Sequence, residues 1–200
     1  MTYSEQSPPC GGNAFTAAIG KFMLAISGWK IEGNVPQYPK MVIAVGPHTS
    51  NWDFVLGLAV LFVLRIKIRF LGKHSLFVTP FKQFLHSIGG IPVDRRSAHG
   101  MVGQVVGAFN AQSKMILALS PEGTRSPIYP WKTGFLAIAQ QAQVPVVLVG
   151  FDFIKKRVYI KEVIKASDDF DKDMQKIYQY FATISPKYPQ NVLLKNSKAQ

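Results

Sequence analysis

Cysteine, long hydrophobic runs and acidic residues are all scarce in this chain of 200 residues. Cys10 is the only cysteine, which excludes an intrachain disulfide and fits a reducing compartment. The sequence contains neither a Gly-x-Ser-x-Gly nor a His-Glu-x-x-His motif. It therefore indicates neither a serine nucleophile on a strand–helix turn nor a histidine-based zinc site, and we expect no bound metal and no cofactor.

The longest charge-free apolar run near the middle of the chain extends from Phe54 to Leu64 and ends at Arg65. This run is too short to cross a bilayer, which takes about 20 residues. The amino terminus shows no basic segment followed by an apolar stretch and a small-residue cleavage site, so no secretory signal is evident.

Acidic residues are outnumbered, with 11 Asp and Glu against 23 Lys and Arg and a formal net charge of +12. Such a chain attracts nucleic acid, an anionic membrane surface or anionic substrates. No helix-turn-helix, zinc-finger or RNP-like pattern stands out, so we do not expect nucleic acid as a partner. Hydrophobic residues make up 48% of the chain, and a basic, apolar chain without a spanning segment is typical of a peripheral membrane protein. We expect it at the cytoplasmic face of the inner or plasma membrane, where each basic residue adds about 1 kcal/mol of attraction.

Residues 14–30 predict an amphipathic helix, because Phe15, Ile19, Phe22, Met23, Ile26 and Trp29 recur at helical spacing. This apolar face either lies in a membrane interface or packs on the protein core. The sequence leaves both interpretations open.

After residue 40, short apolar strands alternate with helices. We expect strands at 41–45, 68–71, 91–93, 115–119, 144–151 and 158–163, and helices at 52–64, 81–87, 97–112, 133–143 and 168–184. The alternation predicts an α/β fold, in which helices flank a mixed, largely parallel sheet. Because no internal repeat or linker is visible, we expect residues 14–200 to form a single domain behind a flexible tail of residues 1–13.

Polar turns follow three of the predicted strands. His48 follows the strand at 41–45, Asp94-Arg95-Arg96 follows the strand at 91–93, and Ser120 to Ser126 follow the strand at 115–119. Ligand sites in open α/β sheets form beyond the carboxyl ends of the strands. The three turns are therefore expected to converge on one pocket.

His48 and Asp53 pair a candidate proton acceptor with a candidate orienting carboxylate. Five residues along one helix turn two side chains about 140° apart, so the pair meets only if His48 lies in the turn before the helix that carries Asp53. Either Ser50 or Asn51 can cap a helix that begins at Trp52. An aspartate in a first helical turn also has an ordinary explanation, because it complements the helix dipole.

The turn from Ser120 to Ser126 combines an acid, a glycine and a guanidinium. Gly123 permits a tight backbone or a close ligand, and Arg125 offers a planar fork suited to a phosphate or a carboxylate. Glu122 can support either Arg125 or a backbone donor. An ordinary loop with a Glu–Arg ion pair is the alternative.

Four motifs occur in order: His48-x4-Asp53, Gly90-Ile91-Pro92-Val93-Asp94-Arg95, Pro121-Glu122-Gly123-Thr124-Arg125-Ser126 and Val144-Pro145-Val146-Val147. Together they resemble the glycerophospholipid acyltransferase family, most closely its 1-acyl-sn-glycerol-3-phosphate (lysophosphatidate) acyltransferase branch. The resemblance covers about residues 41–151. It implies an O-acyltransferase of phospholipid biosynthesis.

The resemblance also implies a role for each matching residue, with His48 as the general base and Asp53 as its orienting partner. The residues implied to bind the substrate or to shape its pocket are Lys73, Arg95, Glu122, Gly123, Thr124 and Arg125, of which Arg125 contacts the acceptor phosphate. Trp52 either lines an acyl groove or packs in the core, and we expect the core. The Val-Pro-Val segment either serves acyl-donor binding or pocket packing, as the resemblance implies, or is simply a buried strand, and we expect the buried strand.

The implied reaction moves a fatty acyl group from acyl-CoA or acyl carrier protein to a hydroxyl of a lysophospholipid. The acceptor hydroxyl itself is the expected nucleophile, so no acyl-enzyme forms. Three alternatives stay open. They are another lysolipid acceptor such as a lyso-ornithine lipid, a non-catalytic module that binds anionic membranes, and a metal-dependent hydrolase that uses His48, Asp53, His74 and His86.

Overall fold

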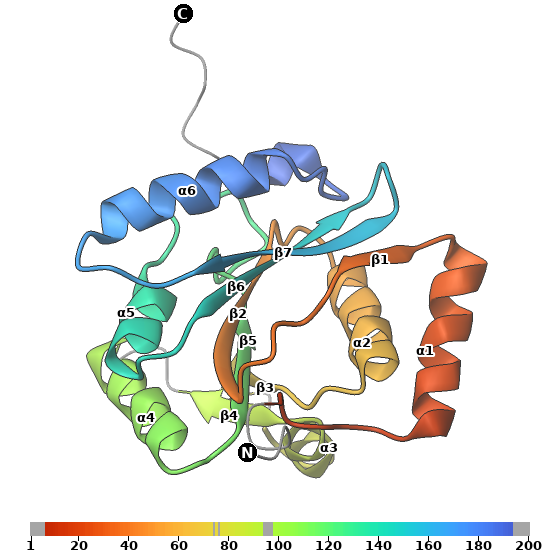
Figure 1. The fold of residues 1–200 in the computed structure, drawn as a ribbon, viewed down its shortest axis with the longest axis horizontal. Coiled ribbons are helices and arrows are strands. Elements are labelled where there is room, and N and C mark those ends of the chain that lie inside the picture. The colour runs from red at the N-terminus through yellow and green to blue at the C-terminus, as the bar shows by residue number, and fades with distance from the viewer. Residues whose placement is uncertain (1–6, 74, 76, 94–97, 194–200) are drawn as a thin grey trace, which may run out of the picture.

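The computed structural model describes residues 7–73, 75, 77–93 and 98–193. A seven-stranded sheet runs through the molecule, and helices cover both of its faces (Figure 1). Its strands are β1 (Lys30–Gly33), β2 (Lys40–Gly46), β3 (Arg69–Lys73), β4 (Gly90–Val93), β5 (Met115–Leu119), β6 (Val146–Asp152) and β7 (Arg157–Ile164), in the spatial order β1-β7-β6-β2-β5-β3-β4. β6 and β7 pair in antiparallel fashion, and the other neighbouring strands pair in parallel. The predicted α/β fold with a mixed, largely parallel sheet is confirmed.

The helices form two groups on opposite faces of the sheet (Figure 1). One group holds α1 (Ala14–Ser27) and α2 (Trp52–Leu64), and the other holds α4 (Ala98–Asn110), α5 (Gly134–Gln141) and α6 (Phe170–Ala182). The remaining α-helix of the described residues, α3 (Phe81–Ser87), lies beside β4 at the sheet edge. The sequence pattern did not predict two of the described elements, namely β1 and the short 3-10 helix η2 (Pro189–Asn191).

The central strands bring two of the predicted polar turns together. β2 and β5 are parallel neighbours, with Ala44 opposite Leu119 near their carboxyl ends. Both strands point the same way, so the turn that holds His48 and the turn that begins at Ser120 leave the sheet side by side. β6 lies on the other side of β2 and is buried at every residue. The expected buried strand after the Val-Pro-Val motif is confirmed.

α1 packs on α2 through small residues. A Cβ atom on Gly20 would lie 2.6 Å from the carbonyl oxygen of Ala59, so the two backbones approach this closely because residue 20 has no side chain. Ala17 and Leu24 are buried on the same face of α1.

The opposite face of α1 is apolar and exposed. Phe15, Phe22 and Ile26 are 72%, 65% and 70% exposed. Of the residues whose spacing predicted the helix, Phe15, Phe22 and Ile26 point outward, whereas Met23 and Trp29 are partly buried against the core. No helix among the described residues is long and apolar enough to cross a membrane.

Part of the segment expected to be a tail lies against the loop after α2. The Gly11 N–H donates to the Arg65 carbonyl at 2.8 Å, and the Lys67 N–H donates to the Pro9 carbonyl at 2.9 Å. Residues 1–6 lie outside the described part of the chain.

Candidate active site

His48 and Asp53 meet as their spacing required. His48 lies in the turn before α2, and its Nδ1 is 3.0 Å from Oδ2 of Asp53 in the first turn of that helix. The same Oδ2 accepts the backbone N–H groups of Thr49 and Ser50, each at 2.9 Å. Asp53 is only 3% exposed. With Nδ1 facing the carboxylate, Nε2 is the ring nitrogen left to act as a base.

The two candidate caps of α2 have different roles. The hydroxyl of Ser50 accepts the Trp52 N–H at 3.1 Å. Asn51 occupies the N-cap position without a side-chain capping bond. Its Oδ1 instead accepts a hydrogen bond from the guanidinium of Arg125. The predicted phosphate-binding arginine is therefore attached to the turn that carries the histidine.

Glu122 links the two turns from below the surface. Its Oε2 accepts the backbone N–H of His48 at 2.6 Å and the Ser120 hydroxyl at 3.1 Å. Glu122 is 4% exposed, and this burial raises its pKa to about 7, while the His48 N–H and the Ser120 hydroxyl act in the opposite direction. Two roles were considered for Glu122, and the structure shows it supporting a backbone donor, the His48 N–H, and not Arg125.

Gly123, Thr124 and Arg125 line the large cavity described below. Gly123 has a φ of 65°, a left-handed conformation that favours glycine. The hydroxyl of Thr124 accepts the Ser126 N–H at 3.2 Å, which closes the turn.

Two predicted basic residues cannot be placed at the site. Arg95 lies outside the described residues, as does the side chain of Lys73, whose backbone ends β3. His74, considered above as a metal ligand, also lies outside them. Within the described residues, no three His, Cys, Asp or Glu side chains gather as a metal site would require.

Trp52 corrects one prediction. Its side chain is 58% exposed, so the expectation that it packs in the core is wrong. The ammonium of Lys187 lies 4.7 Å from the centre of its ring. The exposure of Trp52 could not be predicted from helical periodicity, because α2 is apolar on nearly all sides.

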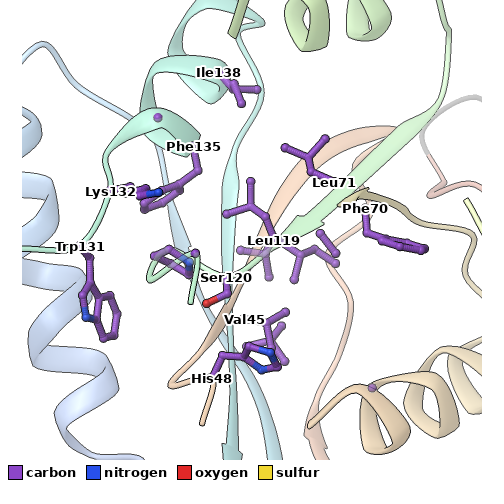
Figure 2. A pocket seen from close by; sticks show the side chains of 18 of the residues that line it. Val45, His48, Phe70, Leu71, Leu119, Ser120, Trp131, Lys132, Phe135 and Ile138 are labelled. Carbon is purple, nitrogen blue, oxygen red and sulfur yellow. The ribbon is translucent and has the colours of Figure 1, made fainter. Parts of the chain in front are cut away.

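A cavity of about 1850 Å³ opens beside His48. Its lining is mostly apolar, and the lining residues come mainly from strands β2, β3, β5 and β6 and from helices α2, α4, α5 and α6. Figure 2 shows His48, Val45 and Ser120 grouped in one part of the cavity, with Leu71, Phe135 and Ile138 farther from the histidine. The site thus places a base, a guanidinium and a large apolar space next to one another.

The fold and this site define an acyltransferase of the α/β type, in which a His–Asp pair just beyond the carboxyl end of the central strand β2 faces an apolar cavity. The model of the family described as Acyltransferase matches residues 29–152, and the chain belongs to that family. The resemblance drawn from the order of the four motifs is confirmed.

A solved structure similar to this chain is the crystal structure of the 1-acyl-sn-glycerophosphate (LPA) acyltransferase, PlsC, from Thermotoga maritima. The TM-score is 0.56 at 17% sequence identity, over 86% of this chain and 80% of that chain. At this identity the likeness establishes a shared fold. None of the curated proteins compared with the chain gave a match.

Proposed function

We propose that this acyltransferase moves a fatty acyl group from an acyl thioester to a hydroxyl of a lysophospholipid such as 1-acyl-glycerol-3-phosphate. One observation carries the proposal, namely that the His48–Asp53 pair and Arg125 line the same large, mostly apolar cavity. The base is suited to a hydroxyl, the guanidinium to a phosphate, and the cavity to acyl chains. The thioester is acyl-CoA or acyl-carrier protein.

In the proposed mechanism, Nε2 of His48 removes the proton from the acceptor hydroxyl as its oxygen attacks the thioester carbonyl. The new C–O bond forms, the C–S bond breaks, and the imidazolium returns the proton to the leaving thiolate. Asp53 holds the imidazole in the required tautomer and stabilises its charged form. General-base assistance of this kind contributes about 10²- to 10⁴-fold, and orientation of the two substrates contributes further.

The size of the cavity supports a lipid substrate. Pockets for ordinary small ligands occupy about 300–1000 Å³, whereas this cavity holds about 1850 Å³. A reaction that brings an acyl donor and an acyl-bearing acceptor together needs room for two chains. A non-catalytic membrane-binding module has no use for such a space beside a base.

We also propose that the enzyme is peripheral and works on an anionic membrane, with the exposed apolar face of α1 in the interface. Phe15, Phe22 and Ile26 supply the apolar contact, and the net charge of +12 supplies the attraction. Lys73 and Arg95 remain predicted contributors to phosphate binding.

The test of this function is acyl transfer by the purified protein, with acyl-CoA and acyl-carrier-protein donors and a panel of lysolipid acceptors that includes lyso-ornithine lipid. Mass spectrometry identifies the product, and thiol release gives the rate. His48→Ala is expected to abolish transfer while the protein remains folded and bound to vesicles. Full activity of a folded His48→Ala protein would refute the mechanism, and product from an acceptor without phosphate in preference to the others would refute the acceptor class.

A further inference from the structure

A second, smaller and polar pocket lies beside the catalytic turn. It has a volume of about 360 Å³ and is lined by Thr49, Ser50, Asn51, Trp52, Arg125, Ser126, Tyr188 and Asn191. Arg125 lines this pocket as well as the large apolar cavity, so the two spaces share the guanidinium. Tyr188 and Asn191 come from the carboxyl-terminal part of the chain, which matches none of the four sequence motifs.

Specific contacts attach this carboxyl-terminal segment, residues 187–191, to the catalytic turn. The Tyr188 N–H donates to the hydroxyl of Thr49 at 3.2 Å. The ammonium of Lys187 lies over the ring of Trp52 at 4.7 Å and near the ring of Tyr188 at 5.8 Å. Two aromatic rings that line the pocket thus hold a cation through cation–π attraction.

The chemistry of the lining favours an anion. Arg125 is its cation, and none of the lining residues is acidic. A guanidinium has five N–H donors, of which Asn51 takes one. The amino end of α2, where the helix dipole is positive, also faces this pocket.

The carboxylates of the catalytic turns do not line this pocket. Oδ2 of Asp53 lies 3.0 Å from Nδ1 of His48 and accepts the N–H groups of Thr49 and Ser50. Glu122 accepts from the His48 backbone and Ser120. A cationic headgroup such as an ethanolamine or an ornithine amine would therefore find no lining carboxylate here, whereas a phosphate monoester would find donors on several sides.

We propose that residues 187–191 complete the binding site for the acceptor's anionic headgroup, with Lys187 as a second cation and Asn191 as an amide donor. The proposal rests on the proposed function and deepens it, because it assigns the choice of a phosphate-bearing acceptor to the carboxyl-terminal segment. Lys187 and Asn191 act on binding and take no part in proton transfer.

The test uses five variants of the full chain. Lys187→Gln removes the cation and Lys187→Arg keeps it, while Asn191→Ala removes the amide. Gln190→Ala is the control for Asn191, since Gln190 is exposed in the same turn and does not line the pocket. Lys161→Gln, an added control, removes a lysine that lies 4.9 Å from the Tyr159 ring, away from both pockets.

Two measurements distinguish the source of the phosphate. Steady-state kinetics gives separate KM values for 1-acyl-glycerol-3-phosphate and for the donor. Ligand-observed NMR titration follows the binding of sn-glycerol 3-phosphate, and of adenosine 3′,5′-bisphosphate as the phosphate part of the CoA donor. We expect Lys187→Gln to raise the acceptor KM about two- to fivefold and Asn191→Ala about three- to tenfold. The binding of glycerol 3-phosphate should weaken in parallel in both variants, whereas Lys187→Arg should behave as wild type. In all variants, kcat and the donor KM should equal the wild-type values.

Two outcomes overturn the proposal, and a third overturns the proposed function while the headgroup site stands. If Lys187→Gln and Asn191→Ala match their controls, the segment is not part of the site. If donor KM and bisphosphate binding change instead, the pocket serves the donor. If wild type binds glycerol 3-phosphate with the expected pattern among variants but transfers no acyl group, the headgroup site stands and the proposed function fails.

Discussion

At the scale of single residues, the site depends on one buried carboxylate that orders a turn. Oδ2 of Asp53 lies 3.0 Å from Nδ1 of the imidazole and accepts two backbone N–H groups, so it holds both the ring and the loop that carries it. Asp53→Asn preserves the volume but offers an uncharged oxygen. We expect kcat to fall by about 10²-fold or more, because the amide no longer stabilises the imidazolium, while the acceptor KM changes little. Steady-state kinetics checks this split, and a rise in KM at constant kcat would contradict it.

Glu122 gives the protein a predictable pH dependence. Its pKa in the folded state is raised from 4.5 to about 7 by burial, so the unfolded chain loses this proton first as the pH rises. Between about pH 4.5 and 7 the unfolded state holds fewer protons than the folded state, and stability declines across that window. The decline amounts to about 3 kcal/mol at most, at about 1.4 kcal/mol for each pH unit.

Glu122→Gln removes this titration and retains an oxygen that can accept the His48 N–H. The free energy of unfolding of the wild type, minus that of the variant, is expected to decrease from pH 5 to pH 8. Urea titrations at several pH values measure the difference, and groups that titrate alike in both proteins cancel. A difference that stays flat or grows with pH would show that the carboxyl is ionised throughout.

At the scale of elements, the contact between α1 and α2 depends on the missing side chain of Gly20. A methyl group there would lie 2.6 Å from the Ala59 carbonyl oxygen, whereas a methyl on Gly107 of α4 meets nothing within 4 Å. Gly20→Ala is therefore expected to destabilise the protein by about 1–3 kcal/mol through overpacking. Gly107→Ala should stabilise it by about 0.5–1 kcal/mol through helix propensity. Thermal or urea unfolding of the two variants gives opposite signs, and equal signs would contradict the close packing of these helices.

The sequence predicted elements well where an apolar pattern had a clear period. β2, α2, β5 and α6 lie within a few residues of their expected positions. β1 was missed because it is a four-residue edge strand, Lys-Ile-Glu-Gly, whose pairing with β7 is not visible locally. The polar residues His48 and Asp53 were found because a short turn joins them. The hydrogen bond between Thr49 and Tyr188 joins residues 139 positions apart, so it could not be predicted from a local sequence pattern.

At the scale of the whole molecule, the exposed apolar face of α1 predicts how the enzyme reaches its lipid substrates. Phe22→Ser combined with Ile26→Ser removes two side chains that are 65% and 70% exposed, so the fold should tolerate the change. We expect binding to lipid vesicles to weaken by about tenfold or more, because each apolar side chain that enters the interface contributes more than about 1 kcal/mol. Vesicle flotation measures the loss. Phe84→Ser on α3, which removes a side chain that is 57% exposed, is the matched control and should bind as wild type.

We expect charge and apolar contact to make separable contributions to vesicle binding. The net charge of +12 attracts anionic lipid, and raising the salt from 0.1 M to 1 M shortens the screening length from about 10 Å to about 3 Å. We expect high salt to release much of the wild-type protein from vesicles that contain anionic phospholipid. Binding to vesicles of neutral phosphatidylcholine should be weaker at the start and change little with salt, since it depends on α1 alone. The Phe22→Ser, Ile26→Ser protein should lose binding to both kinds of vesicle. Salt-independent binding to anionic vesicles would show that the basic residues do not contribute to membrane binding. Their role would then be limited to the binding of anionic substrates.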